Sequence, residues 1–67
     1  MIDLPLEKGA RIAIQSSDQA ARPYVEWHGF VMESGDAQTY VMRRDFPAGI
    51  FAGALPDALP TQPIQIL

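Results

Sequence analysis

The chain contains no cysteine. Disulfide bonds and a cysteine-based zinc site are therefore excluded. Histidine occurs once, as His28, so one chain cannot assemble a metal site from several imidazoles. We expect neither a metal nor a cofactor, because no catalytic, metal-binding or phosphate-binding motif stands out.

Basic residues are also few. Five Lys and Arg stand against eight Asp and Glu, which gives a formal net charge of −3. Phosphate binding depends on clustered cations, and Arg43 and Arg44 are the only adjacent pair of bases. The charge pattern therefore disfavours nucleic acid as the main partner.

Long apolar runs are absent as well. No run approaches the ~20 residues that a membrane-spanning helix requires. The N-terminal residues lack the basic start and apolar centre of a secretory signal. We therefore expect a cytoplasmic protein.

The length predicts one domain over residues 1–67, with residues 1–9 as an extended lead-in interrupted by Pro5 and Gly9. An apolar share of 48% is enough for a globular core. A chain this short nevertheless buries only roughly 60% of its unfolded surface. Without disulfides or a metal, a partner or a second copy is the remaining source of stability.

The clearest local pattern is a β-hairpin. Two apolar, aromatic-rich runs, Tyr24–Glu33 and Gln38–Arg44, flank the turn-forming residues 34–36. A two-residue type II′ turn at Gly35 and Asp36 would place Phe30 opposite Val41 and His28 opposite Arg43. A three-residue loop, which shifts this register by one, stays open.

Gly29 interrupts the first arm of this hairpin, which has apolar residues on both faces. A glycine inside a strand often marks a bulge or a bend. We therefore expect a long second strand that bends at Gly29 and belongs to two sheets.

Five further segments complete the expected fold. A first strand is expected over 10–15, with Ile12 and Ile14 on one face and Arg11, Ala13 and Gln15 on the other. Pro23 is expected to stop any helix in the loop over 16–23 after one turn. Strands are expected at 50–55 and 63–67, with one short 3-10 turn over 56–59 between them.

This order of elements is similar to that of SH3-like barrels, and we predict an all-β, five-stranded barrel of that kind. An α+β fold, with a helix over 48–55 lying across a three-stranded sheet, is the alternative. The expected core residues are Ile12, Ile14, Val25, Trp27, Val31, Val41, Ile50, Leu55, Leu59, Ile64 and Ile66.

The first arm of the hairpin also offers a candidate contact surface. Trp27 and Phe30 must point to opposite faces of one strand. If Trp27 is buried, then Tyr24, Phe30 and Met32 form an exposed apolar stripe, of the kind that marks partner surfaces. The reverse orientation stays open, as does a stripe covered by residues 2–6.

Two charged candidates accompany the stripe. His28 has no nucleophile and orienting carboxylate placed with it, so we interpret it as a surface or interface residue. Arg43 and Arg44, beside Asp45, are interpreted as a solvated strand end, with binding of an acidic partner or a phosphate as the other possibility.

We hypothesise a small non-catalytic protein-binding module, such as an inhibitor, adaptor or minor structural subunit, that docks onto a partner or onto itself. A nucleic-acid-binding barrel that uses Arg11, Arg22, Arg43, Arg44 and exposed aromatic residues is the alternative. An enzyme has the least support. The expected partner-binding residues are Tyr24, His28, Phe30, Met32, Arg43 and Arg44.

Overall fold

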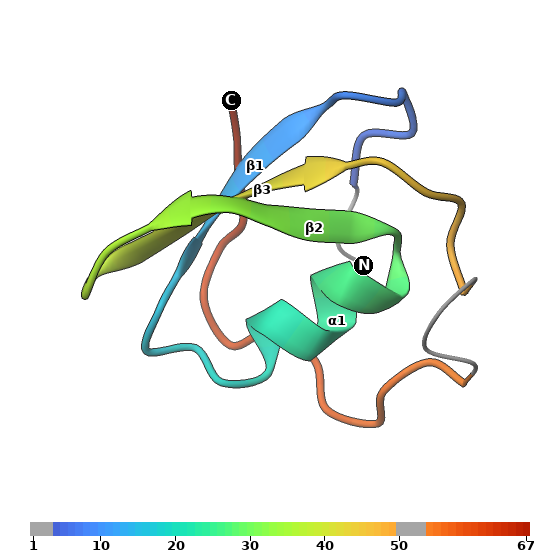
Figure 1. The fold of residues 1–67 in the computed structure, drawn as a ribbon. Helices are drawn as coiled ribbons and strands as arrows, with labels where there is room; N and C mark the ends of the chain where they lie inside the picture. The colour runs from blue at the N-terminus through green and yellow to red at the C-terminus, as the bar shows by residue number, and fades with distance from the viewer. Residues whose placement is uncertain (1–3, 50–53) are drawn as a thin grey trace.

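The computed structural model describes residues 4–49 and 54–67. One α-helix lies on one face of a four-stranded antiparallel sheet with the strand order β2-β3-β1-β4 (Figure 1). The sheet is open, with β2 and β4 at its edges, so it is not the closed five-stranded barrel that we expected. In chain order the elements are β1 (Arg11–Gln15), α1 (Ala21–Trp27), β2 (Phe30–Gly35), β3 (Thr39–Arg44) and β4 (Gln65–Ile66).

Strand β1 confirms the first strand expected from the sequence, but burial does not alternate along it, because Ala13 is buried between Ile12 and Ile14. Ile12 and Ile14 are 0% and 2% exposed, whereas Arg11 and Gln15 at the strand ends face solvent. The strand pairs with β3 on one side and with β4 on the other, so it lies at the centre of the sheet.

Helix α1 corrects the first arm of the expected hairpin. Residues 24–27 are helical, and the helix begins at Ala21. Pro23 therefore lies in the first helical turn, where the backbone N–H groups have no partner within the helix in any case. We had taken Pro23 as the end of a helical turn, but at this position a proline is compatible with a helix that continues.

Gly29 ends this helix and does not bend a strand. Its φ of +92° is in the left-handed region that favours glycine after a helix. A Cβ atom at this position would lie 1.8 Å from the carbonyl oxygen of Phe46. The Gly29 carbonyl accepts the backbone N–H groups of Asp45 at 3.0 Å and Phe46 at 3.2 Å, which ties the end of α1 to the segment after β3.

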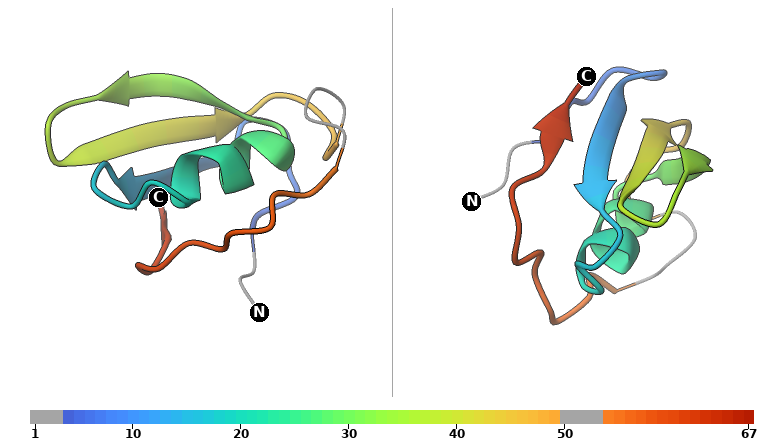
Figure 2. Two further views of the ribbon diagram at one scale, coloured as in Figure 1. Left: turned by 90° about the horizontal axis from the view of Figure 1, so that it is seen from below. Right: turned by 90° about the vertical axis from the view of Figure 1, so that its left-hand side faces the viewer.

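The hairpin between β2 and β3 is present, but its turn lies later than expected. Phe30 pairs with Arg44, and a bulge follows Met32, so the predicted register is wrong. Asp36 explains the turn, because its Oδ1 accepts the backbone N–H of Gln38 at 2.8 Å and that of Thr39 at 2.9 Å. The hairpin tip projects beyond α1 (Figure 2).

The buried core lies between α1 and the sheet. Of the expected core residues, Ile12, Ile14 and Val25 are buried, and Ile64 packs against them. Trp27, Val31 and Val41 are half-buried, Leu55, Leu59 and Ile66 are exposed, and Ile50 lies outside the described residues. The core cluster consists of Ile12, Ile14, Ala21, Tyr24, Val25, Phe30 and Met42.

The C-terminal segment is mostly irregular where the structure describes it. Residues 56–59 contain bends and no 3-10 turn, and the expected last strand shortens to Gln65–Ile66. Ala54 and Leu55 belong to neither a strand nor a helix, and Ala48 and Gly49 form a turn. The rest of the expected strand or helix at 48–55 lies outside the described residues.

Asp18 holds this segment to the body of the protein. Its carboxylate is buried before α1, and Oδ2 accepts the backbone N–H groups of Thr61 at 2.8 Å and Gln62 at 2.9 Å. The chain then returns to pair β4 with β1 (Figure 2). Within the described parts of the chain, no helix has the length and apolar character to cross a membrane.

Candidate functional site

The end of β3 places two neighbouring arginines on opposite faces of the sheet. Side chains alternate along a strand, so Arg43 faces away from α1 while Arg44 lies on the same side as the core residue Met42. The two arginines therefore meet different surroundings.

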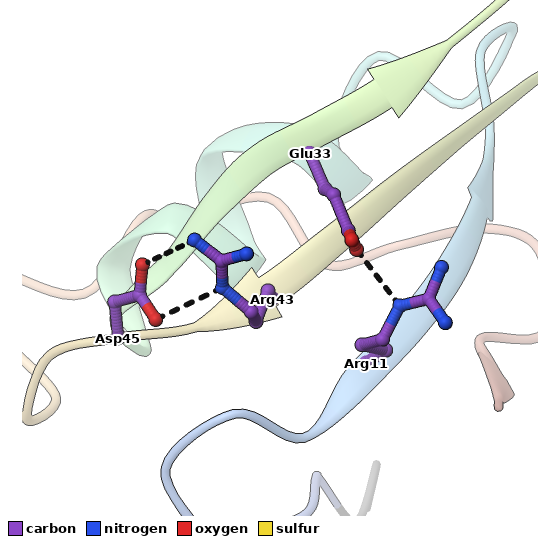
Figure 3. Close-up of polar contacts among 4 residues, drawn as sticks. All are labelled: Arg11, Glu33, Arg43 and Asp45. Atoms are coloured by element: carbon purple, nitrogen blue, oxygen red, sulfur yellow. Dashed lines mark hydrogen bonds and ion pairs between the residues drawn. The ribbon is translucent and has the colours of Figure 1, made fainter.

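On the face turned away from α1, the charges are paired. Arg43 Nε donates to Asp45 Oδ1 at 3.0 Å, and Nη2 donates to Oδ2 at 2.9 Å. This hydrogen-bonded pair raises the pKa of Arg43 and lowers the pKa of Asp45. A second pair joins Arg11 Nε in β1 to Glu33 Oε2 in β2 at 2.8 Å, across β3 (Figure 3).

Arg44 is buried, with 6% of its surface exposed. Its Nε donates to the carbonyl oxygen of Pro5 at 2.7 Å, and its guanidinium carbon lies 4.9 Å from the centre of the Phe30 ring. Burial lowers the pKa of Arg44. Within residues 4–49 and 54–67, no carboxylate forms an ion pair with it.

The Nη1 and Nη2 atoms of Arg44 are not among the buried polar atoms without a partner, which places them at the small exposed part of this residue. The described residues provide no hydrogen-bond acceptor for either atom. Among described side chains that are not exposed, the buried polar atoms without a partner are Asp18 Oδ1 and His28 Nε2, and the Nη atoms are not of this kind. The free end of the guanidinium is therefore available to an acceptor from outside the chain.

Beside Arg44 the surface is hollowed. The hollow has a volume of about 320 Å³ and lies between the N-terminal segment and the chain that follows β3. It combines apolar walls with two cationic side chains and one carboxylate. Its lining residues are Leu6, Lys8, Arg44, Asp45, Phe46 and Pro47.

His28 lies at the end of α1, near Arg44 but outside the lining of the hollow. Its ring centre is 4.8 Å from that of Tyr24 and 4.9 Å from that of Trp27. Burial lowers the pKa of His28, and the positive charge of Arg44 lowers it further. The imidazole is therefore neutral at pH 7, and its Nε2 has no hydrogen-bond partner among the described residues.

The expected partner-binding residues are divided between the core and the surface. Tyr24 and Phe30 are 8% and 2% exposed, so they belong to the core and form no exposed stripe. Met32 is 38% exposed. Arg43 lies on the face of the sheet that is turned away from α1. Met32 pairs with the core residue Met42, so the structure groups Tyr24, His28, Phe30, Met32 and Arg44 on the α1 side, and only Arg44 of these lines the hollow.

The arginines of the nucleic-acid alternative do not share one groove. Arg11 and Arg43 lie on the face turned away from α1 (Figure 3). Arg44, the next residue along β3, lies on the other face. Arg22, on the helix, is 3.4 Å from the carboxylate of Glu26.

Sequence reasoning missed most of the hollow. Leu6 and Lys8 belong to the segment that we interpreted as a lead-in, and Phe46 and Pro47 to a turn. One available signal was the alternation along β3, which requires one arginine of an adjacent pair to point inward.

Among the residues that the structure describes, no group of three or more acidic or histidine side chains could hold a metal ion. Comparisons of this chain with protein-family models, with curated proteins and with solved structures find no match.

Proposed function

We propose that this chain is a small non-catalytic protein-binding module and that the hollow beside Arg44 is its contact surface. The observation that carries this proposal is a buried arginine whose guanidinium has no carboxylate partner within the described residues. Such a group is costly in isolation and gains most when a partner supplies the missing acceptor.

Exposed apolar side chains support the same role. Leu6, which lines the hollow, is 83% exposed, and Phe46 is 37% exposed. Exposed apolar surface with charged residues beside it is typical of protein interaction sites. Other large apolar side chains exposed in the described chain are Met32, Leu55, Leu59, Ile66 and Leu67.

The partner is either another protein or a second copy of the chain. Both would cover apolar surface that a domain of this size cannot bury by itself. The cytoplasmic location stays a prediction from the sequence.

The test compares Leu6→Ser with Leu59→Ser. Leu59 is 58% exposed and lies outside the lining of the hollow, which makes it a matched control. Sedimentation velocity measures self-association, and affinity capture with a tagged chain identifies bound proteins. We expect Leu6→Ser to weaken association or capture and Leu59→Ser to leave both unchanged. A wild-type chain that is strictly monomeric and retains no protein above background would contradict the proposal.

A further inference from the structure

Starting from the proposed binding role, we propose that the hollow binds the carboxylate of an Asp or Glu side chain in a partner protein. The end of the Arg44 guanidinium holds this carboxylate, and an apolar neighbour of the acidic residue packs on Leu6 and Phe46. The ligand is therefore an acidic peptide segment flanked by apolar residues.

The charges around the site favour an anionic group. Arg44 lacks a carboxylate partner among the described residues, whereas Arg43 and Asp45 already neutralise each other. Lys8, which is exposed, adds a second positive charge to the lining. A chain with a net charge of −3 thus carries a local positive site in this hollow.

The geometry of Arg44 favours a carboxylate in one orientation. Because Nε already donates to the Pro5 carbonyl, the side edge of the guanidinium is occupied. The Nη1 and Nη2 atoms remain, and together they match the two oxygens of a carboxylate that approaches end-on. A lysine at this position would offer a point charge without this fork.

The walls explain why the acidic residue should have apolar neighbours. Leu6, Phe46 and Pro47 contribute apolar surface beside the guanidinium. An apolar side chain of the partner that packs there also excludes water from the ion pair, which strengthens it.

A nucleic-acid phosphate fits the observations less well. Binding along a phosphate backbone requires several cations on one surface, but Arg11 and Arg43 lie on the opposite face of the sheet and Arg22 is on the helix near Glu26. The apolar walls also have no counterpart in a solvated phosphate chain.

A purely structural role accounts for only part of Arg44. The hydrogen bond to Pro5 uses one of its five N–H groups, and the contact with Phe30 uses the face of the guanidinium. Neither interaction occupies the Nη end.

The experiment is an NMR titration of the full chain with two short peptides. The first is acetyl-Leu-Glu-Leu-amide, and the second is the neutral analogue acetyl-Leu-Gln-Leu-amide. We expect the acidic peptide to shift the Nε–Hε signal of Arg44 and the backbone amides of Leu6, Lys8 and Phe46. The analogue should bind about tenfold more weakly, because it lacks charge-assisted hydrogen bonds.

Two variants locate the effect. Arg44→Lys keeps the positive charge but removes the fork, so the preference for the acidic peptide over the analogue should become smaller. Lys8→Gln changes an exposed side chain and so avoids the risk of unfolding; it should weaken the acidic peptide more than the analogue. Arg11→Gln, on the opposite face and paired with Glu33 outside the hollow, is the control and should change neither affinity.

The outcomes separate this proposal from the proposed function. Equal binding of both peptides at the same residues would overturn the carboxylate preference and leave the hollow as a docking site. A single-stranded oligonucleotide that shifts the same signals more strongly than the acidic peptide would also overturn it. If neither peptide produces shifts at the hollow, the carboxylate proposal fails, and the association experiment with Leu6→Ser decides the binding role separately.

Discussion

The two faces of β3 each carry an arginine, and the two side chains differ in burial, in ion pairing and in the direction of their pKa shift. Arg43 is half-exposed, forms a two-bond pair with Asp45 and has a raised pKa. Arg44 is buried, has no carboxylate partner in the described chain and has a lowered pKa. Adjacent positions in one strand thus provide a satisfied charge and an unsatisfied one.

This difference indicates which charges are available to a partner. Exposed ion pairs such as Arg43 with Asp45 contribute little to stability, and a partner that bound there would first have to break them. Arg44 has no such competitor among the described residues, and burial has already removed most of its own surface from water. A partner carboxylate therefore gains more on the α1 side of the sheet than on the other.

Asp18 gives a second comparison on the α1 side. This carboxylate is 5% exposed, and burial alone would raise its pKa. The backbone N–H groups of Gln62 and Thr61 donate to it and lower the pKa below 3.8. Asp18 therefore finds donors within the chain, whereas the Nη end of Arg44 finds no acceptor among the described residues.

The largest expected effect comes from Gly29→Ala. This substitution disturbs the contact between the end of α1 and residues 45–47, which directly follow Arg44. The new Cβ would meet the Phe46 carbonyl oxygen at 1.8 Å, and φ is +92°. We expect the free energy of unfolding to fall by roughly 3 kcal/mol, measured by urea denaturation.

Gly9→Ala is the control for Gly29→Ala. Gly9 has a φ of +87°, but a Cβ there would meet no atom within 4 Å. It should lose about 1 kcal/mol from backbone strain alone. An equal loss in both variants would show that the contact with Phe46 does not matter.

A smaller effect is expected from Asp18→Asn, which tests the buried acid. Asparagine keeps one accepting oxygen but loses the negative charge, so two charge-assisted hydrogen bonds from the Thr61 and Gln62 N–H groups become neutral ones, which should cost about 2 kcal/mol near neutral pH. The folded pKa is lowered, so this contribution is complete above the unfolded value of 3.8 and is lost as the pH falls through the folded pKa.

Urea denaturation as a function of pH measures this effect. The difference between the wild type and Asp18→Asn should shrink as the solution becomes acidic. Asp57→Asn, which changes an exposed carboxylate, serves as the control. A difference that stays constant down to low pH would mean that Asp18 acts through packing and not through its charge.

The sequence predicted those parts of the fold that depend on local alternation. Ile12 and Ile14 identified β1 because one face of that strand is buried and its ends are polar. The hairpin between β2 and β3 was also found, because β-branched and aromatic residues flank a turn-forming cluster. Its register was wrong because the side chain of Asp36 selects the turn, which a count of turn residues does not reveal.

The rest depended on contacts between distant segments. The composition of residues 24–27 suits a strand as well as a helix. A helix can form there because Pro23 lies in its first turn, where a proline is tolerated. The hollow joins Leu6 and Lys8 to Phe46 and Pro47, which are far apart in the chain. No local pattern places these segments side by side, so the sequence identified Arg44 as a candidate without its surroundings.

Arg44→Met separates stability from binding at the site. Replacing an unpaired buried charge with an apolar side chain of similar length is often neutral, so we expect the free energy of unfolding to change by less than about 1 kcal/mol. Binding of the acidic peptide should be lost. Arg11→Met, on the face turned away from α1 and paired with Glu33 outside the hollow, should move neither the urea midpoint nor the peptide affinity. A loss of stability as large as that of Gly29→Ala would identify Arg44 as a structural anchor.

The smallest expected effect is electrostatic, and it is measured at His28. Burial is the larger cause of its lowered pKa, and the charge of Arg44 is the second. Arg44→Met should therefore raise the pKa of His28 while leaving it below 6.5. Arg43 lies on the other face and is paired with Asp45, so Arg43→Met should leave this pKa unchanged.

The titration of the His28 Cε1–H signal by NMR measures this pKa directly, and stability provides a second readout. Because the folded pKa is below the unfolded value of 6.5, the unfolded chain takes up the proton first as the pH falls. Stability is therefore complete above pH 6.5 and declines from there to the folded pKa. The decline should be shallower in Arg44→Met than in the wild type. If Arg44→Met and Arg43→Met gave His28 the same pKa, the charge of Arg44 would affect His28 no more than the charge of Arg43 on the other face.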